Sequence, residues 1–232
     1  MSVNKFKVPV TEPVTEVIQS PKIILEKKSL SGDSGETSLC SGERLKKNNK
    51  IISAIGTVEE LSALLGIIKA EHFDANSERK FDIANSTKVF FFGRLTQIQE
   101  SLHDIIVSVG TSQKNSARYN SSRFLQGEQR IKDLEQQISS MKEYGTVDWP
   151  TNPKTSIIPG TSILEAQLQY SRTICRRAER QVISSQNIQI GIVPEPNVLG
   201  FLNRLGDYLL ALSIHSLHLH SKEPMKRTGL KK

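Results

Sequence analysis

Four arginines and one glutamate lie within the nine residues 172–180. Read as a helix, positions i, i+4, i+7 and i+8 of this segment share one face, and they hold Arg172, Arg176, Glu179 and Arg180. A guanidinium group holds a phosphate through two parallel hydrogen bonds, so a face of this kind can bind a polyanion. The alternative is a solvated helix face with ordinary ion pairs, which the spacing alone does not exclude.

Apolar residues run through the same segment and favour a helix that is buried along one side. They are Ile163, Leu164, Ala166, Leu168, Tyr170, Ile174, Ala178 and Val182. A second run that mixes apolar, arginine and carboxylate residues covers 201–208 and contains Asn203, Arg204 and Asp207. Clustered charge on a buried helix is costly unless an anion or a partner chain meets it. An anion-binding site and a subunit contact are therefore alternatives to the solvated helix face.

A glycine-rich stretch at residues 29–38 is the second place where the residue types indicate chemistry. Gly32 and Gly35 would let consecutive backbone N–H groups turn inward around a phosphate, and the Ser and Thr hydroxyls add donors. Lys46 and Lys47 follow and could supply positive charge. The Gly-Lys-Ser/Thr ending of a Walker loop is missing. A flexible linker would have the same composition.

Hydrophobic periodicity predicts the elements that position these residues. Five long amphipathic helices are expected at about residues 53–71, 87–109, 123–142, 162–184 and 196–220. Residues 28–50 are expected to form a loop, and residues 143–161, with Pro150, Pro153 and Pro159, a non-helical crossover. No period-two pattern predicts a strand, and no internal repeat is visible. The sequence therefore predicts an all-α fold, a five-helix antiparallel bundle preceded by a glycine-rich loop.

Composition bounds the class of protein. The chain has 232 residues, of which 37% are hydrophobic and 6% aromatic, and this suits one helical domain with a Leu/Ile core. The net charge of +7 would allow nucleic acid as a partner. No zinc-finger spacing or aromatic-rich basic sheet motif is present, so nucleic-acid binding is the least favoured reading. No run of about 18 apolar residues is present, so no membrane contact is expected.

The ends of the chain and its cysteines predict the remaining organisation. A flexible N-terminal extension at 1–27 and a basic C-terminal tail at 221–232 are expected to flank a single domain over 28–220. The extension lacks the apolar core of a secretory signal and the basic face of a mitochondrial presequence. Cys40 and Cys175 are expected as free thiols of an intracellular protein, in the cytoplasm or the mitochondrial matrix.

Histidine placement gives no support for a protein metal site. His215 and His218 would share one helix face, but no third ligand lies near them in the sequence. A terminal, partly exposed helix face explains the two residues better.

Six motifs, taken in order, resemble those of the ATP:cob(I)alamin adenosyltransferases of the trimeric type. Residues 31–38 are similar to T-G-D-K-G-x-T-S, 41–44 to T-G-E-R, 56–62 to G-T-x-D-E-L-S and 98–104 to I-Q-x-x-L-x-D. Residues 176–180 match R-R-A-E-R outright, and residues 201–208 match F-L-N-R-L-S-D-Y with one change. The resemblance covers about residues 28–220, and the last two motifs together are highly specific.

The resemblance implies a fold and a reaction. The family fold is a five-helix bundle that forms a homotrimer, with active sites between adjacent subunits and a glycine-rich nucleotide-binding loop. The implied reaction transfers the 5′-deoxyadenosyl group of ATP, with Mg²⁺, to the cobalt of cob(I)alamin, and gives adenosylcobalamin and triphosphate. The reduced cobalt is the nucleophile, so the protein orients the substrates and stabilises the leaving charge. An adenosylcobalamin-dependent mutase is the implied acceptor of the product.

The resemblance also implies roles for single residues. The phosphates of ATP would be bound by Ser29, Ser31, Gly32, Thr37, Ser38 and Lys47. Arg176 and Glu179 would be catalytic and contact ATP, with Arg177 and Arg180 beside them. Asn203 would contact the nucleotide. Glu59 and Arg172 would hold the subunit interface near the site.

The chain departs from the family pattern at several positions. Leu30 and Ser34 replace two basic residues near the phosphates, and Ser156 replaces an aromatic residue that in the family packs near the lower face of the corrin. Glu59 replaces an aspartate. These departures define an alternative, a family member that keeps the trimer and ATP binding but has lost cobalamin chemistry and acts as a structural or regulatory module.

Overall fold

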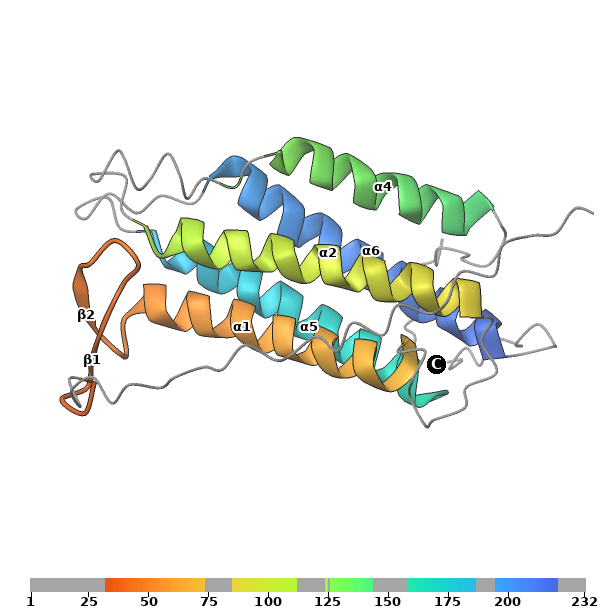
Figure 1. The fold of residues 1–232 in the computed structure, drawn as a ribbon, viewed down its shortest axis with the longest axis horizontal. Helices are drawn as coiled ribbons and strands as arrows, with labels where there is room; N and C mark the ends of the chain where they lie inside the picture. Colours follow the sequence, from red (N-terminus) through yellow and green to blue (C-terminus); the bar gives the residue numbers. More distant parts are fainter. Residues whose placement is uncertain are drawn as a thin grey trace, which may run out of the picture. The chain divides into compact units, whose positions relative to one another are not determined.

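The computed structural model describes residues 32–73, 85–111, 124, 126–143, 158–186 and 195–220. They all belong to the second of two compact units, Gly32–Lys232. These residues form five α-helices, namely α1 (Lys50–Ile68), α2 (Asn85–Val109), α4 (Gly127–Glu143), α5 (Ile163–Ser184) and α6 (Pro196–His220) (Figure 1). A π-helical turn, η1 (Lys69–Phe73), continues α1. The prediction of a mostly helical protein with five long helices is confirmed.

Helix α1 begins at Lys50, slightly before the predicted start, because Asn49 caps it. The side chain of Asn49 accepts a hydrogen bond of 2.9 Å from the backbone N–H of Ile51, and this satisfies one of the unpaired donors of the first turn. The apolar side of the helix is buried along its whole length by Ile51, Ala54, Val58, Leu61, Leu65 and Ile68. This cap fixes where the glycine-rich segment ends and the bundle begins.

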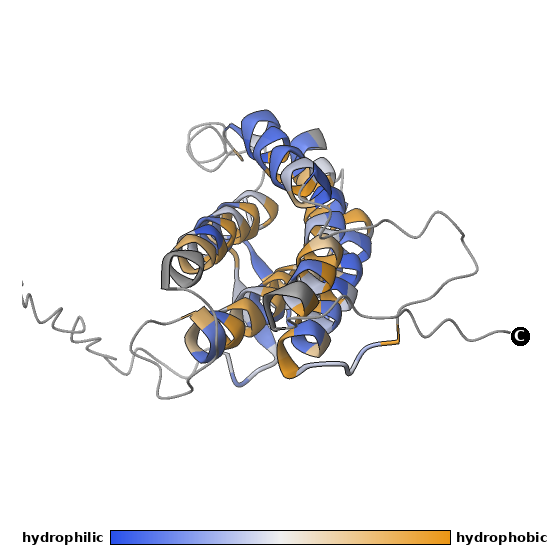
Figure 2. Cartoon of the chain, turned by 90° about the vertical axis from the view of Figure 1, so that its right-hand side faces the viewer, coloured by the Kyte–Doolittle hydropathy of each residue, from blue (hydrophilic) through white to orange (hydrophobic). Residues whose placement is uncertain are grey.

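Helix α5 lies between α1 and α6 and contributes to the centre of the core. Its buried side includes Leu164, Leu168, Ile174, Cys175, Ala178 and Val182. From α6, Phe201, Leu205 and Tyr208 are also buried. Figure 2 shows apolar residues concentrated on the sides of the helices that face one another. The outer side of α5 is therefore left for its charged residues.

Specific hydrogen bonds fix the directions of neighbouring helices. Gln167 of α5 donates to Glu71 at 2.8 Å, while Arg177 further along α5 pairs with Glu60 earlier in α1. Helices α1 and α5 therefore run in opposite directions. In the same way, the Cys175 thiol donates to the Leu202 carbonyl at 3.2 Å, and Gln169 donates to Ser213 at 2.9 Å. Helices α5 and α6 thus also run in opposite directions.

Helix α4 does not fit a simple antiparallel bundle, because it packs on α6 and runs in the same direction. Arg204 of α6 pairs with Glu135 of α4 at 3.0 Å. One turn earlier, Gly200 faces Ile131, and near the start of both helices Gly127 faces Asn197. Successive helices run in alternating directions along the chain. Helices α4 and α6 are separated by one helix, α5, so they are parallel where they pack together. The sequence pattern carried no information on which helices are neighbours.

A short β-hairpin corrects the prediction that residues 28–50 form only a loop. Strands β1 (Glu36–Ser38) and β2 (Arg44–Lys46) pair antiparallel, with Thr37 opposite Leu45. Leu39 is buried against the bundle, and the Ser41 hydroxyl donates to the carbonyl of Gly110 at the end of α2. Strands of three residues are too short to show a period-two pattern.

Several predictions fall outside the described residues. They concern the extension at 1–27, the tail at 221–232 and the residues Ser29, Leu30, Ser31 and Ser156. Within the described residues, α1 with η1 is one helix long and apolar enough to cross a membrane by length and composition alone. The core helix of a helical bundle passes the same test, and α1 buries one side in the core.

Candidate functional site

A capping box holds the N-terminal end of α5 and so fixes the helix that carries the arginines. The hydroxyl of Ser162 accepts a hydrogen bond of 3.1 Å from the backbone N–H of Glu165. In return, the Glu165 carboxylate accepts from the backbone N–H groups of Gly160 and Thr161. Ser162 thus satisfies a donor that the first helical turn leaves unpaired, and Glu165 ties the two residues before the cap to the helix.

Three of the charged residues of α5 have partners. Arg177 forms an ion pair with Glu60 of α1. Arg180 donates to the backbone carbonyl of Arg176 at 3.0 Å, so its side chain folds back along its own helix. Glu179 accepts from the amide of Asn203 on α6 at 3.4 Å. The structure therefore brings Glu179 and Asn203 together, as expected for two residues of one site.

The guanidinium groups of Arg172 and Arg176 are in a different situation. Neither makes a hydrogen bond or an ion pair to any other part of the chain that the structure describes. Arg176 is exposed and Arg172 is half-buried. An exposed arginine without a protein partner on an otherwise ordered helix has all its donors available for an anion.

Cys175 lies inside the same helical turn but has no chemical role in an exposed site. It is fully buried, and burial, followed by the negative charge of Glu179, raises the pKa of its thiol to about 12. A thiol in this state is a poor nucleophile at neutral pH. Its hydrogen bond to Leu202 instead joins α5 to α6 directly behind the arginine face.

The 201–208 motif divides into a site residue and structural residues. Asn203 is exposed and reaches Glu179. Arg204 pairs with Asp207 at 2.8 Å and with Glu135 of α4, so it joins α4 to α6. Tyr208 is fully buried, and burial raises the pKa of its hydroxyl. Sequence reasoning did not separate these roles, because helical spacing does not show which helix packs on which side.

The hairpin places Lys47 beside the glycines. The ammonium nitrogen of Lys47 would lie 3.4 Å from a Cβ atom at Gly32, and its backbone N–H donates to the carbonyl of Gly35 at 2.8 Å. Gly35 has a φ of 79°, which L side chains rarely adopt. Thr37 is half-buried on β1 and Ser38 is exposed. Gly32, Thr37, Ser38 and Lys47 therefore lie on one small unit, as a phosphate loop requires.

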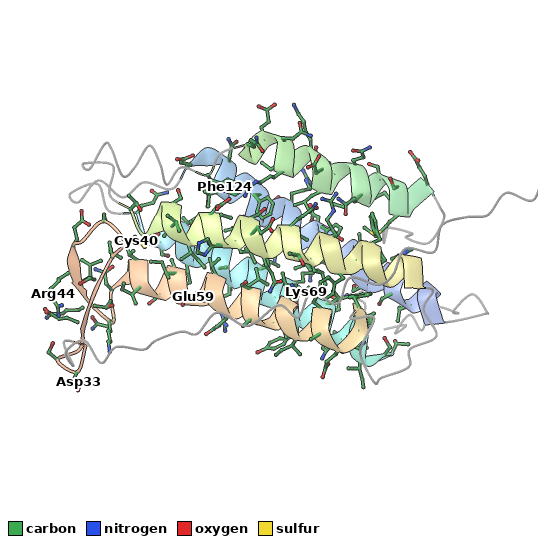
Figure 3. All side chains as sticks on the ribbon, in the orientation of Figure 1. Asp33, Cys40, Arg44, Glu59, Lys69 and Phe124 are labelled. Carbon is green, nitrogen blue, oxygen red and sulfur yellow. The ribbon has the colours of Figure 1, made fainter. Side chains whose placement is uncertain are left out.

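Residues 41–44, which resemble T-G-E-R, form the turn of the hairpin and the start of β2. The Ser41 hydroxyl donates to the carboxylate of Glu43, and Gly42 has a φ of 98°. Arg44 pairs with Glu36 across the two strands at 3.3 Å. Figure 3 shows Asp33, Cys40 and Arg44 on the hairpin at one end of the helices, whereas Glu59 lies further along α1. The segment thus shapes the hairpin, and its arginine is occupied by Glu36.

No hydrogen bond or ion pair joins Gly32, Thr37, Ser38 or Lys47 to residues 172–180 in the described part of the molecule. Glu59, expected at a subunit interface with Arg172, is exposed. Among the described residues, no group of three or more His, Cys, Asp or Glu side chains could hold a metal ion.

Comparison with known proteins connects this geometry to one family. The family model described as cobalamin adenosyltransferase matches residues 28–216. The human corrinoid adenosyltransferase MMAB is 31% identical over 205 residues, covering 87% of this chain and 71% of that protein. The Bacillus subtilis corrinoid adenosyltransferase is 30% identical over 186 residues, covering 78% of this chain and 81% of that protein.

Solved structures agree with this family. A variant PduO-type ATP:corrinoid adenosyltransferase from Lactobacillus reuteri, complexed with cobalamin and ATP, superimposes with a TM-score of 0.65 at 27% identity. The match covers 84% of this chain and 92% of that one. The helical fold, the arginine face of α5 and the family match over most of the chain lead to one conclusion, that this chain belongs to the cobalamin adenosyltransferase family.

Proposed function

We propose that this protein transfers the 5′-deoxyadenosyl group of ATP to the cobalt of cob(I)alamin. The observation that carries the proposal is the exposed guanidinium of Arg176, which has no partner among the described residues and stands at the first arginine of R-R-A-E-R. The bond from cobalt to C5′ forms while the bond from C5′ to the ester oxygen breaks, and triphosphate leaves. Negative charge accumulates on that leaving group, where an arginine stabilises it most.

The hairpin and the outer face of α5 would share the binding and orientation of ATP. The backbone N–H groups and hydroxyls of the hairpin, with Lys47, would hold the phosphates. Arg176 and Arg180 would face the triphosphate, and the Glu179–Asn203 pair would orient the nucleoside. Orientation is a major part of catalysis when the nucleophile belongs to a substrate. Mg²⁺ would arrive with the nucleotide and be coordinated mainly by its phosphates.

The homotrimer that the resemblance implies is part of this proposal, and the positions of the hairpin and of the arginine face of α5 support it. Among the described residues, the hairpin and the α5 face of one chain share no hydrogen bond or ion pair, which supports a site built from the hairpin of one subunit and α5 of its neighbour. Exposed apolar side chains that share one side of α1 and α5, namely Ile67, Ile163 and Tyr170, support burial of this side against a second copy. Glu59 and Arg172 would pair across the same contact.

The chemistry also fits an intracellular setting. Cob(I)alamin is a strongly reducing species and needs a reducing compartment, and no disulfide joins Cys40 to Cys175. The product would then pass to an adenosylcobalamin-dependent enzyme, such as a mutase.

An adenosylation assay tests the proposal directly. The purified chain is incubated with ATP, Mg²⁺ and chemically reduced cobalamin, and adenosylcobalamin formation is followed by its absorbance. Product well above a protein-free control is expected. ATP binding without product would instead support the alternative of a family member that has lost cobalamin chemistry.

A Ser156→Phe variant is compared in the same assay. A higher rate in this variant would show by how much the serine lowers the rate of adenosylation.

A further inference from the structure

The ion pair between Glu60 and Arg177 is a contact that the family motifs do not assign. It joins α1 to α5, and its side chains are 57% and 46% exposed, respectively. Exposed ion pairs of this kind contribute little to folding stability. The main effect of this ion pair is therefore on the positions of the charged side chains of α5. Its effect on the stability of the bundle is secondary.

Arg176 and Arg177 point to different sides of α5 although they are consecutive. Successive residues of a helix are about 100° apart around its axis. The stem of Arg176 lies toward α6, where its Cγ atom would be 3.9 Å from a Cβ atom at Gly206. Arg177 instead reaches Glu60 on α1. The two arginines cannot serve one anion equally.

Glu60 and Asn203 hold α5 from opposite sides. Glu60 acts from α1 through Arg177, and Asn203 acts from α6 through Glu179. The buried side of α5 in the core sets the rotation of the helix, and these two contacts hold the side chains on either edge of its outer face. The guanidinium of Arg176 is left between them without a partner among the described residues.

From these contacts we infer that Glu60 is a positioning residue for the proposed nucleotide site, and that Arg177 is its anchor and does not bind triphosphate. The pair neutralises Arg177 and holds it toward α1. This leaves Arg176, with Arg180 beside it, to meet the leaving group. The inference rests on the proposed function, and it changes the expected role of Arg177 from an ATP contact to a support of one.

A double-mutant cycle tests this assignment. Glu60→Gln, Arg177→Gln and the combined variant are compared for the Kd of ATP by calorimetry and for kcat and KM in the adenosylation assay. We expect each single change to weaken ATP binding by about three- to tenfold, the scale of one displaced charge-assisted contact. The combined variant should be no weaker than the worse single variant, because the two residues act as one unit.

The split between KM and kcat separates positioning from a general structural defect. A merely destabilised protein loses active molecules and lowers kcat at unchanged KM, whereas a displaced Arg176 raises the KM for ATP. Glu128→Gln is the matched control, since Glu128 pairs with Lys132 on the exposed side of α4 at 2.7 Å. This control should leave the Kd, KM and melting temperature unchanged.

Three results would overturn the inference. If Arg177→Gln abolished ATP binding while Glu60→Gln left it unchanged or tightened it, Arg177 would be a triphosphate ligand. If neither change altered the Kd or the KM, the pair would have no positioning role. If the wild-type chain did not bind ATP, there would be no site to position. A wild-type chain that binds ATP but forms no product contradicts the proposed function alone, and the cycle in Kd still decides the role of Glu60.

Discussion

At the scale of single residues, the arginines of α5 differ in what surrounds them. Arg177 is paired with Glu60, Arg180 donates to its own helix, and the guanidinium of Arg176 has no partner in the described part of the chain. Positive charge alone therefore does not identify the anion-binding residue. Among the described residues, Arg172 and Arg176 are the arginines of this face with unused donors, and Arg176 is the more exposed of the two and the more accessible to a phosphate.

Arg176→Ala should weaken ATP binding by about ten- to a hundredfold, because a bidentate contact to a charged oxygen is lost. The fold should be unchanged, since the side chain is exposed and leaves no buried group unpaired. Calorimetry gives the Kd, and thermal melting checks the fold. Lys132→Ala on α4 is a control that also removes one exposed positive charge. Unchanged ATP affinity in Arg176→Ala would show that this residue does not bind the nucleotide.

Cys175 gives a prediction about pH. Its thiol pKa is about 12 in the folded protein, against 9.0 for an unperturbed thiol. Between these values the unfolded chain releases a proton that the folded chain keeps, so stability falls as pH rises through this window. The loss attributable to this group is about 1.4 kcal/mol at pH 10. Urea unfolding at pH 7 and pH 10 measures it, and Cys175→Ala should show a smaller difference. An equal difference in both proteins would contradict the assignment.

At the scale of elements, the hairpin behaves as a separate unit attached to the end of the bundle. Its shape depends on Gly35 and Gly42, whose φ angles of 79° and 98° are strained for other residues. Its attachment depends on Leu39, which is buried, and on Ser41, which donates to Gly110. A change in the hairpin can therefore alter the proposed phosphate loop with little effect on the helices.

Gly35→Ala tests this separation. No atom lies within 4 Å of the added Cβ, so only the backbone strain of about 1–2 kcal/mol acts. Because the Gly35 carbonyl accepts from the backbone N–H of Lys47, we expect weaker ATP binding and a nearly unchanged melting temperature. Gly93→Ala in the middle of α2 is the control, since that position is also open but helical. Loss of ATP binding in the control would mean that the assay reports global damage.

At the scale of the whole molecule, periodicity predicted the helices well but not their arrangement. Apolar stripes such as that of α1 appear in the sequence because one side of each helix is buried. The hairpin was missed because its strands are three residues long. The Glu60–Arg177 contact was missed because the two residues are 117 positions apart. Only the register of α1 against α5 reveals that contact, and no single helix contains this information.

The outer side of α1 and α5 carries the last prediction. Glu60 lies opposite Arg177 and Glu71 opposite Gln167, so Ile67 and Tyr170 lie at the same level on neighbouring helices. They are 50% and 58% exposed. Two large apolar side chains side by side at the surface indicate a contact between subunits. Helix α1 is then apolar on two sides for two reasons. One side is buried in the core, and the other would be buried in the proposed interface.

Tyr170→Glu should therefore convert the proposed trimer into monomers, because a carboxylate would be buried without a partner at the contact. Light scattering coupled to size-exclusion chromatography gives the mass. ATP binding should be lost together with the trimer, since a complete site would need the hairpin of one subunit and α5 of another. Phe90→Glu is the matched control, because Phe90 is 56% exposed but lies on α2. A monomer that still binds ATP at full affinity would place the whole site within one chain, and a Tyr170→Glu trimer would move the interface to another side of the bundle.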